Sequence, residues 1–278
     1  MNKKKKRWVV FMSVLFTTLV LNTACNAKVT GNSVNLEGQF DGKAIDNISV
    51  YSPTAKVFLE KSKDDSIHVK LSGTFSGSKE EEDKLISTMV NGSELIVKVE
   101  NAGSRLWKQN KLQLDIQVPD KDYEKFVIET SSGDIKMDKH TVNILDLEAS
   151  SGDIEVPSFH GLEFKIKTDS GNIDAKHLMG KGDVKASSGD VKISLDDFSE
   201  SVSVETSSGD AKVYVPENAA FHIEAKTKWK KASINLPVTI VKNEDEKVIV
   251  GKVNNAETAP TLHIKTSSGK FLLDKSSK

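Results

Sequence analysis

The sequence is poor in the residues that usually staple or thicken a fold. It has one cysteine, Cys25, which cannot form an internal disulfide, so a disulfide scaffold is excluded. Aromatic residues make up 6% and hydrophobic residues 37% of the 278 positions. The chain is long enough for one large domain or two small ones. With so few large apolar side chains, we expect a narrow core.

A long apolar run occurs only near the N-terminus. The basic segment Lys3–Arg7 is followed by the apolar run Trp8–Leu21. This is the layout of a secretory signal, which predicts an exported protein. The segment holds five of the 39 basic residues and none of the 40 acidic ones, so the rest of the chain has a formal net charge of −6. Such a chain lacks the concentrated basic face that nucleic-acid binding requires, and we expect no nucleic-acid partner.

Cys25 stands where the apolar run ends, after Leu21-Asn22-Thr23-Ala24. This resembles a lipobox, the motif after which a lipoprotein is cleaved and its cysteine lipidated. The match is imperfect, because the leucine lies one residue too far away and an asparagine takes an apolar position. We predict lipidation of Cys25, which would hold the protein on the outer face of the cell membrane. Two alternatives stay open: Trp8–Ala24 remains as a membrane anchor, or ordinary cleavage follows Ala27.

The strongest signal is a repeated Ser-Ser-Gly-Asp motif. The intervals between its glycines are 19, 19, 18, 20 and 60 residues, the last equal to three periods of 20. Self-similarity at such a period is typical of repeat architectures. Four copies are regular and two are degenerate; they lie at 131–134, 150–153, 187–190 and 207–210, and at 169–172 and 267–270.

Apolar and polar residues alternate on both sides of each glycine, which predicts a strand, a sharp turn and a second strand. A lone unit cannot bury its apolar face, so the units must stack. The sequence therefore predicts an all-β fold, a single-chain parallel β-solenoid with rungs of 19 to 20 residues about 4.8 Å apart. Its core should contain a column of the residues two places after each glycine: Ile135, Ile154, Ile173, Val191, Ala211 and Phe271.

The repeated glycines are predicted to be structural turn residues, because glycine tolerates positive φ and close backbone approach. The serines are expected to hydrogen-bond local amides. No nucleophile-elbow pattern surrounds them, so we predict no catalytic residue. The six turn glycines are Gly133, Gly152, Gly171, Gly189, Gly209 and Gly269.

The aspartates of the motif should form a column beside the glycines. Neighbouring carboxylates about 5 Å apart repel by roughly 1 kcal/mol in water, so something must offset this. Turn amides, solvent and adjacent lysines are one answer, and a bound cation such as calcium is the other. The calcium-roll loop is absent, and Asn172 and Lys270 interrupt the column. Metal binding is therefore a weaker hypothesis, with the candidates Asp134, Asp153, Asp190 and Asp210.

The six histidines have no metal-ligand spacing, and we predict no cofactor. His140, His160 and His177 fall between strands of successive rungs, and we interpret this as chance placement.

The remaining segments are less regular. We predict a leader over 1–24, a tether over 25–46, irregular first rungs over 47–118 and the regular solenoid over 119–275, with Leu262–Leu273 as its final rung. Ser78–Val90 has capping-box spacing and a glycine just beyond it, which predicts a short helix covering the open end.

Trp229 lies among four lysines at 226, 228, 230 and 231. It is a candidate ligand-binding residue for an acidic polymer or a sugar face. The alternative is an aromatic side chain at the rim of the core, flanked by solvated charges.

One stretch, Val118-Pro119, then Tyr123, then Phe126–Ile135, resembles the opening of a known bacterial family. This is the β-strand-repeat "putative adhesin" domain family of unknown function, which includes LiaG-like envelope proteins. The resemblance covers roughly residues 45–275, and the Ser-Ser-Gly-Asp repeat is its specific part. It implies a β-solenoid outside the cytoplasmic membrane and brings no established catalytic residue.

These observations favour a membrane-anchored binding or scaffolding module of the cell envelope, with a cell-wall polymer or an envelope protein as its partner. A regulatory partner of an envelope-stress sensor is the alternative. A polysaccharide-active enzyme is a weaker hypothesis, because the rungs are short and the chain beyond its leader has one arginine, Arg105. A pair of carboxylates clustered in a groove would strengthen it.

Overall fold

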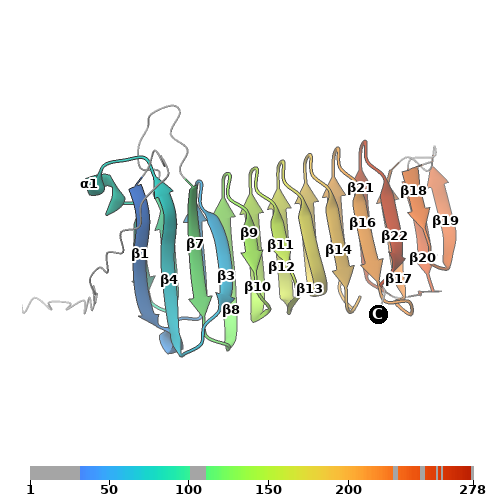
Figure 1. Ribbon diagram of the computed structural model, residues 1–278. Coiled ribbons are helices and arrows are strands. Elements are labelled where there is room, and N and C mark those ends of the chain that lie inside the picture. The colour runs from blue at the N-terminus through green and yellow to red at the C-terminus, as the bar shows by residue number, and fades with distance from the viewer. Residues whose placement is uncertain are drawn as a thin grey trace, which may run out of the picture.

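The computed structural model describes residues 32–100, 111–227, 231–244, 248–254, 256–257 and 259–276. Its strands lie side by side along one axis, from β1 at one end to β19 at the other (Figure 1). The lipidation candidate Cys25 and the binding candidate Trp229 lie outside the described residues.

The strands form two facing ladders, with the core between them. Along the axis, ladder 1 contains β1 (Asn32–Asp41), β4 (Ser66–Phe75), β7 (Lys111–Val118), β3 (Lys56–Lys61), β9 (Ile135–Met137), β11 (Ile154–Val156), the first half of β13 (Ile173–Ala186), β14 (Val191–Leu195), β16 (Ala211–Val215), β22 (Phe271–Lys275) and β18 (Ala232–Ile234).

Ladder 2 contains, in the same direction, β5 (Ile86–Asn91), β6 (Glu94–Val99), β2 (Asn47–Ser52), β8 (Asp122–Thr130), β10 (His140–Ala149), β12 (Phe159–Thr168), the second half of β13, β15 (Val202–Thr206), β21 (Thr261–Thr266), β17 (Phe221–Lys226), β20 (Val248–Val253) and β19 (Val238–Glu244).

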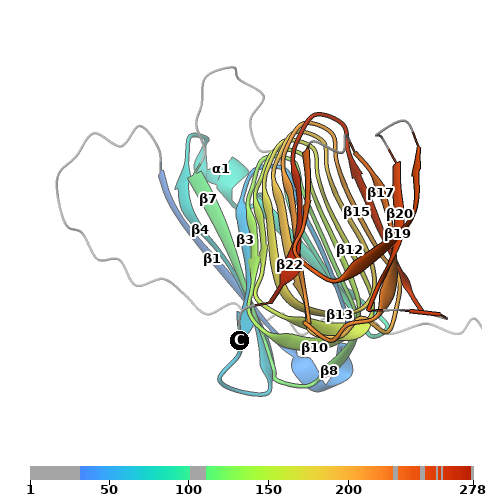
Figure 2. The same cartoon turned by 90° about the vertical axis from the view of Figure 1, so that its right-hand side faces the viewer.

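Pairing is parallel along most of both ladders and antiparallel only near their ends. Along the axis the rungs superpose, with β3 and β22 on one wall and β12 and β15 on the other (Figure 2). Ile154 pairs with Ile135 on one side and Ile173 on the other, and Ile173 pairs with Val191. These four side chains are at most 1% exposed. The predicted parallel β-solenoid and its internal column are confirmed.

The rungs do not stack in chain order. β21 pairs with β15 and β17, so the rung expected to be last lies inside the stack. Gly209 and Gly269 are 60 residues apart in the sequence, but their rungs are neighbours in the stack, because Ser268 N–H donates directly to Ser207 O. The strands between these two rungs in the sequence, β17, β18, β19 and β20, lie beyond β21 and β22 in the ladders. Likewise, β2 lies between β6 and β8, so the first rungs are not consecutive either.

Two predictions for the N-terminal part are wrong. The tether predicted over 25–46 includes β1, which pairs with β4 over its whole length, and a 3-10 turn at Gly42–Ala44. The helix predicted over Ser78–Val90 is limited to α1 (Lys79–Glu82), although its capping box is present. The β-branched residues that follow instead form β5, because edge pairing with β6 supplies the backbone partners that a further helical turn would supply.

The turn glycines are required for close stacking. A Cβ added to any of the six would lie 1.6–2.0 Å from a carbonyl oxygen of the preceding turn in the stack; for Gly171 that oxygen belongs to Gly152. Positive φ, the other expected reason, occurs among the described glycines at Gly73, Gly92 and Gly180 and at none of the six.

Two buried threonines tie their turns to the neighbouring turn. Thr168, fully buried, accepts a hydrogen bond from Gly171 N–H at 3.1 Å and donates one to Gly152 O at 3.1 Å. Thr206 repeats this arrangement two motifs later. The motif serines contribute backbone bonds, such as Ser151 N–H to Ser131 O at 2.9 Å. The turn hydroxyl bonds that we expected from the serines are therefore made by the threonines.

We expect Gly171→Ala to lower the free energy of unfolding by about 1–3 kcal/mol, because the new methyl group meets a backbone oxygen that cannot move independently of the stack. The measurement is the urea midpoint of unfolding. Gly38→Ala is the control, since a Cβ there would meet only the Phe40 ring at 3.4 Å. Equal effects of the two substitutions would contradict the proposed role of close stacking.

A second prediction concerns His140, which is 4% exposed and packs edge-on against the Phe126 ring at 5.8 Å. Burial lowers its pKa; a hydrogen bond to Leu59 O and the charges of Asp138 and Asp120 oppose this, whereas Lys61 adds to it. In the unfolded chain, His140 therefore becomes protonated below a pH of about 6.5, whereas in the folded chain it becomes protonated only at lower pH. As the pH decreases through that window, the free energy of unfolding should fall, by at most about 1.4 kcal/mol per pH unit.

His140→Phe should flatten this fall between about pH 7 and pH 5, a window set by the ordinary histidine pKa. The position pairs with Phe159 in the next rung, so a phenyl ring suits it. Urea unfolding at both pH values is the measurement, and His263→Gln, at an exposed position, controls for the loss of one histidine. An unchanged slope in His140→Phe would show that His140 is not the group responsible.

Candidate functional site

In-register stacking arranges the outward side chains of ladder 2 in rows across the strands. One row, here called the Glu129 row, follows the registered pairs Lys98, Tyr51, Glu129, Glu148, Lys167, Lys185, Glu205, Lys265 and Lys226. Because the residues on either side of each member point into the core or toward the turn, these side chains share one outer face.

Most of the Glu129 row is neutralised by ion pairs between rungs. Lys167 contacts Glu148 at 2.6 Å, and this hydrogen bond is the main reason that the pKa of Lys167 is raised. Lys185 and Lys265 both contact Glu205, whose pKa is lowered chiefly by its hydrogen bond from Lys265. Such exposed pairs contribute little to stability, but they cancel charge along the face.

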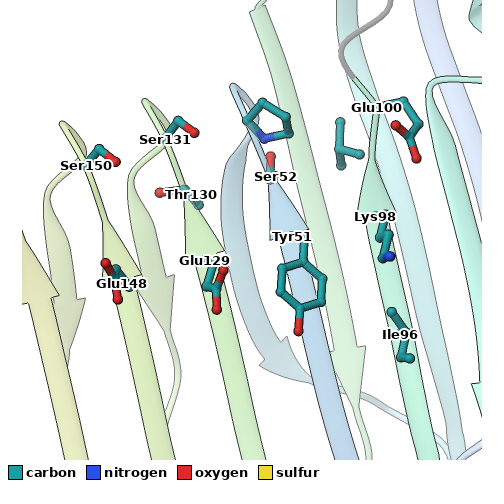
Figure 3. A pocket seen from close by; sticks show the side chains of 12 residues that line it. Tyr51, Ser52, Ile96, Lys98, Glu100, Glu129, Thr130, Ser131, Glu148 and Ser150 are labelled. Carbon is teal, nitrogen blue, oxygen red and sulfur yellow. The ribbon is translucent and has the colours of Figure 1, made fainter.

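A groove lies where the Glu129 row reaches the irregular first rungs. It encloses about 550 Å³. Tyr51, Glu129 and Glu148 lie side by side on adjacent strands, with Ser131 and Ser150 above them at the turns (Figure 3). The remaining lining residues are Ser52, Pro53, Ile96, Lys98, Val99, Glu100 and Thr130.

The groove forms here because the first turn departs from the repeat. Ser52 takes the place of the turn threonine; its buried hydroxyl accepts a hydrogen bond from Ala55 N–H at 3.0 Å. Pro53 follows, at the position equivalent to the first serine of the later turns. Tyr51 occupies the position that elsewhere in the row carries a charge, and the Lys98 ammonium lies 5.7 Å from its ring centroid. The irregular rung therefore adds apolar surface to a charged face.

The groove offers polar groups that are not already committed. Within the described part of the chain, the Glu129 carboxylate and the Ser131 and Ser150 hydroxyls make no hydrogen bond or ion pair. Glu148, in contrast, is held by Lys167 and lies 3.9 Å from Lys165. An aromatic ring beside acceptors and donors that lack a protein partner among the described residues is an arrangement that can bind polar ligands.

The groove does contain neighbouring carboxylates, the feature that would favour an enzyme. A carboxyl group that acts as a general acid needs an apolar pocket to keep it protonated. Glu129 is exposed and Glu148 only half-buried. The arrangement thus supplies a carboxylate pair without the surroundings that tune one member for proton transfer.

The motif aspartates form the expected column, and their side-chain oxygens accept hydrogen bonds from backbone N–H groups of the neighbouring turns. Asp153 N–H donates to Asp134 Oδ1 at 3.2 Å, and Asn172 N–H donates to Asp153 Oδ1 at 2.7 Å. Asn172 continues the column, because its own side-chain oxygen accepts from Asp190 N–H at 3.0 Å. The expectation that Asn172 interrupts the column is therefore wrong.

The remaining links run from Asp210 N–H to Asp190 Oδ1 and from Lys270 N–H to Asp210 Oδ1, both at 2.8 Å. Burial alone would raise the pKa of Asp134, but hydrogen bonds from Lys56 and from Asp153 N–H outweigh burial and lower it. Among the described residues, no group of three or more His, Cys, Asp or Glu side chains is arranged to hold a metal ion. The geometry gives these aspartates a structural role.

The three histidines expected between strands lie instead within β10, β12 and β13. Two of them share one carboxylate. His177 Nδ1 lies 2.8 Å from Asp196 Oδ1, and His160 Nε2 lies 3.4 Å from Asp196 Oδ2. His140 is buried elsewhere, against Leu59 O.

The groove was missed in the sequence because its first rung lacks the Ser-Ser-Gly motif. The signal was present: Ile48, Val50 and Ser52 pair with Phe126, Ile128 and Thr130. Alignment of these three residues with the repeat would have placed Tyr51 in the Glu129 row.

Comparison with known proteins places the chain in a family. No curated protein matches it. Among solved structures, a putative adhesin from Parabacteroides distasonis is 14% identical, with a TM-score of 0.45 over 88% of this chain and 98% of that one. A putative cell adhesion protein from Clostridium sporogenes is 13% identical, with a TM-score of 0.42 over 88% and 100%. Residues 45–273 match the Toastrack DUF4097 family. The chain therefore belongs to the Toastrack DUF4097 family.

Proposed function

We propose that this protein is an extracytoplasmic binding module of the cell envelope, held at the membrane by its N-terminal segment. The observation that carries the binding role is the groove, where the Glu129 carboxylate and two hydroxyls, none of them paired within the described residues, adjoin the Tyr51 ring. Polar groups left unpaired beside apolar surface are what a ligand can satisfy. The long charge-balanced face suits an extended partner, because registered rows present the same groups repeatedly.

Export and anchoring are supported by the sequence of the leader. The basic segment Lys3–Arg7, the apolar run and Cys25 have the order of a lipoprotein signal. No helix within the described residues is long and apolar enough to cross a bilayer. We propose that the N-terminal segment attaches the protein to the membrane, by lipid on Cys25.

Binding is favoured over catalysis by the environment of the carboxylates. The Glu148 carboxylate is engaged by Lys167 at 2.6 Å, and Glu129 is open to solvent. A groove of this kind can hold a polar chain without supplying a poised acid and base.

The binding role is tested by sedimentation of the full chain with isolated envelope material. We expect the detergent-solubilised protein to co-sediment with the wall fraction, and the urea-unfolded protein to stay in the supernatant. The same incubation measures release of soluble fragments. No co-sedimentation, or progressive release of sugar fragments, would count against a binding module.

A separate prediction concerns the anchor. The protein should partition into the membrane fraction, resist a carbonate wash and incorporate radiolabelled palmitate, because two acyl chains give stable attachment. Cys25→Ala should abolish the label, whereas Thr30→Ala, outside the motif, should not. If both variants carry no less label than the original protein, Cys25 is not the lipidated residue. A protein found in the cytosol would contradict export itself.

A further inference from the structure

We infer that the groove binds an uncharged, extended glycan chain that lies across the strands of ladder 2. This inference rests on the proposed binding function and names the ligand class. It depends on the ring, the free polar groups, the rung spacing and the charge of the groove.

The ring supplies the apolar part of a sugar site. Tyr51 is half-exposed on the outer face, with Pro53 and Ile96 as further apolar lining. The face of an aromatic ring carries partial negative charge, which attracts the slightly positive C–H groups on the flat side of a pyranose. The Lys98 ammonium, 5.7 Å from the ring centroid, can donate to hydroxyls of the same sugar.

The free polar groups suit hydroxyls. A sugar hydroxyl both donates and accepts, so it can donate to the Glu129 carboxylate and accept from the Ser131 or Ser150 hydroxyl. Hydrogen bonds to an ionised carboxylate are stronger than neutral ones. The groove thus matches a ligand with many hydroxyls around a ring.

The spacing suits a polymer. Successive rungs are about 4.8 Å apart, close to the length of one hexose in an extended polysaccharide. Ser131 and Ser150 occupy equivalent turn positions on adjacent rungs, as Glu129 and Glu148 do in the Glu129 row. Adjacent sugars of one chain would therefore each meet a serine hydroxyl and a glutamate at the same height, although Lys167 already engages Glu148.

The charge and the backbone exclude two other ligand classes. Among the described lining residues, Glu100, Glu129 and the lysine-paired Glu148 stand against one cation, Lys98, so this lining disfavours an anionic polymer. An extended peptide gains affinity mainly by pairing with a sheet edge, and these strands are interior to ladder 2, with their backbone groups already paired.

The test is calorimetric titration of the full chain in detergent with chitohexaose and with cellohexaose, and with polyglutamate as the anionic probe. We expect at least one neutral oligosaccharide to bind and polyglutamate not to bind. Tyr51→Ala should weaken binding about tenfold or more, and Glu129→Gln several-fold. Tyr51→Leu, which retains apolar bulk, should also weaken it.

The controls are Tyr214→Ala, a tyrosine on ladder 1, and Glu163→Gln, an exposed glutamate of ladder 2 outside the groove. Both should bind as the original protein does, and thermal unfolding of every variant verifies folding. Failure of both neutral oligosaccharides, binding of polyglutamate, or equal losses in Tyr51→Leu and Tyr214→Ala would overturn the glycan inference.

Sedimentation with wall material separates this inference from the proposed function. If Tyr51→Leu co-sediments as well as the original protein, the module binds elsewhere and only the glycan inference fails. If the original protein binds chitohexaose but not the wall, the glycan inference stands and the proposed function fails.

Discussion

The structure depends on how closely one turn can approach the next. At each turn a glycine lies where any Cβ would be within 2.0 Å of the neighbouring carbonyl oxygen. That contact brings the backbone N–H of the residue after the glycine within hydrogen-bond distance of a side-chain oxygen in the neighbouring turn. Asn172 N–H, for example, donates to Asp153 Oδ1 at 2.7 Å. The glycine and the aspartate therefore act together, with a buried threonine at turns such as those of Thr168 and Thr206. They fix the register of the strands on both sides of the turn.

Fixed register has consequences on both faces of each ladder. Inside, like side chains stack on like, so a narrow core of Ile, Val, Leu and Phe is fully buried with few aromatic residues. Gly182 is an exception with a clear cause, since a Cβ there would lie 2.0 Å from the Phe164 ring. Outside, the register places Glu148 beside Lys167, and Glu205 between Lys185 and Lys265. The outer face is thus ordered by the same contacts that order the core.

The groove shows how a departure from the repeat becomes a site. Its first rung keeps the inward positions but changes the turn to Ser52-Pro53 and the outward position to Tyr51. The neighbouring regular rungs then supply Glu129 and Ser131 at defined heights. Local rules of a repeat are expected to fail at functional positions, and here the departure places an aromatic ring among polar groups that have no partner within the described residues.

The sequence by itself determined the rung, its turn and the column from Ile135 to Val191, because alternation and the motif act over a few residues and stacking follows from them. It did not determine the stacking order. The repeat period gives only the distance between motifs along the sequence. The position of a rung in the stack depends on which exposed ladder edge pairs with it and buries its apolar face. As a result, β21 and β22 come before β17 and β18 along the ladders. For the same reason β1 and β5 became edge strands, and Tyr51 came to lie beside Glu129, 78 residues away in the sequence, only once the chain had folded.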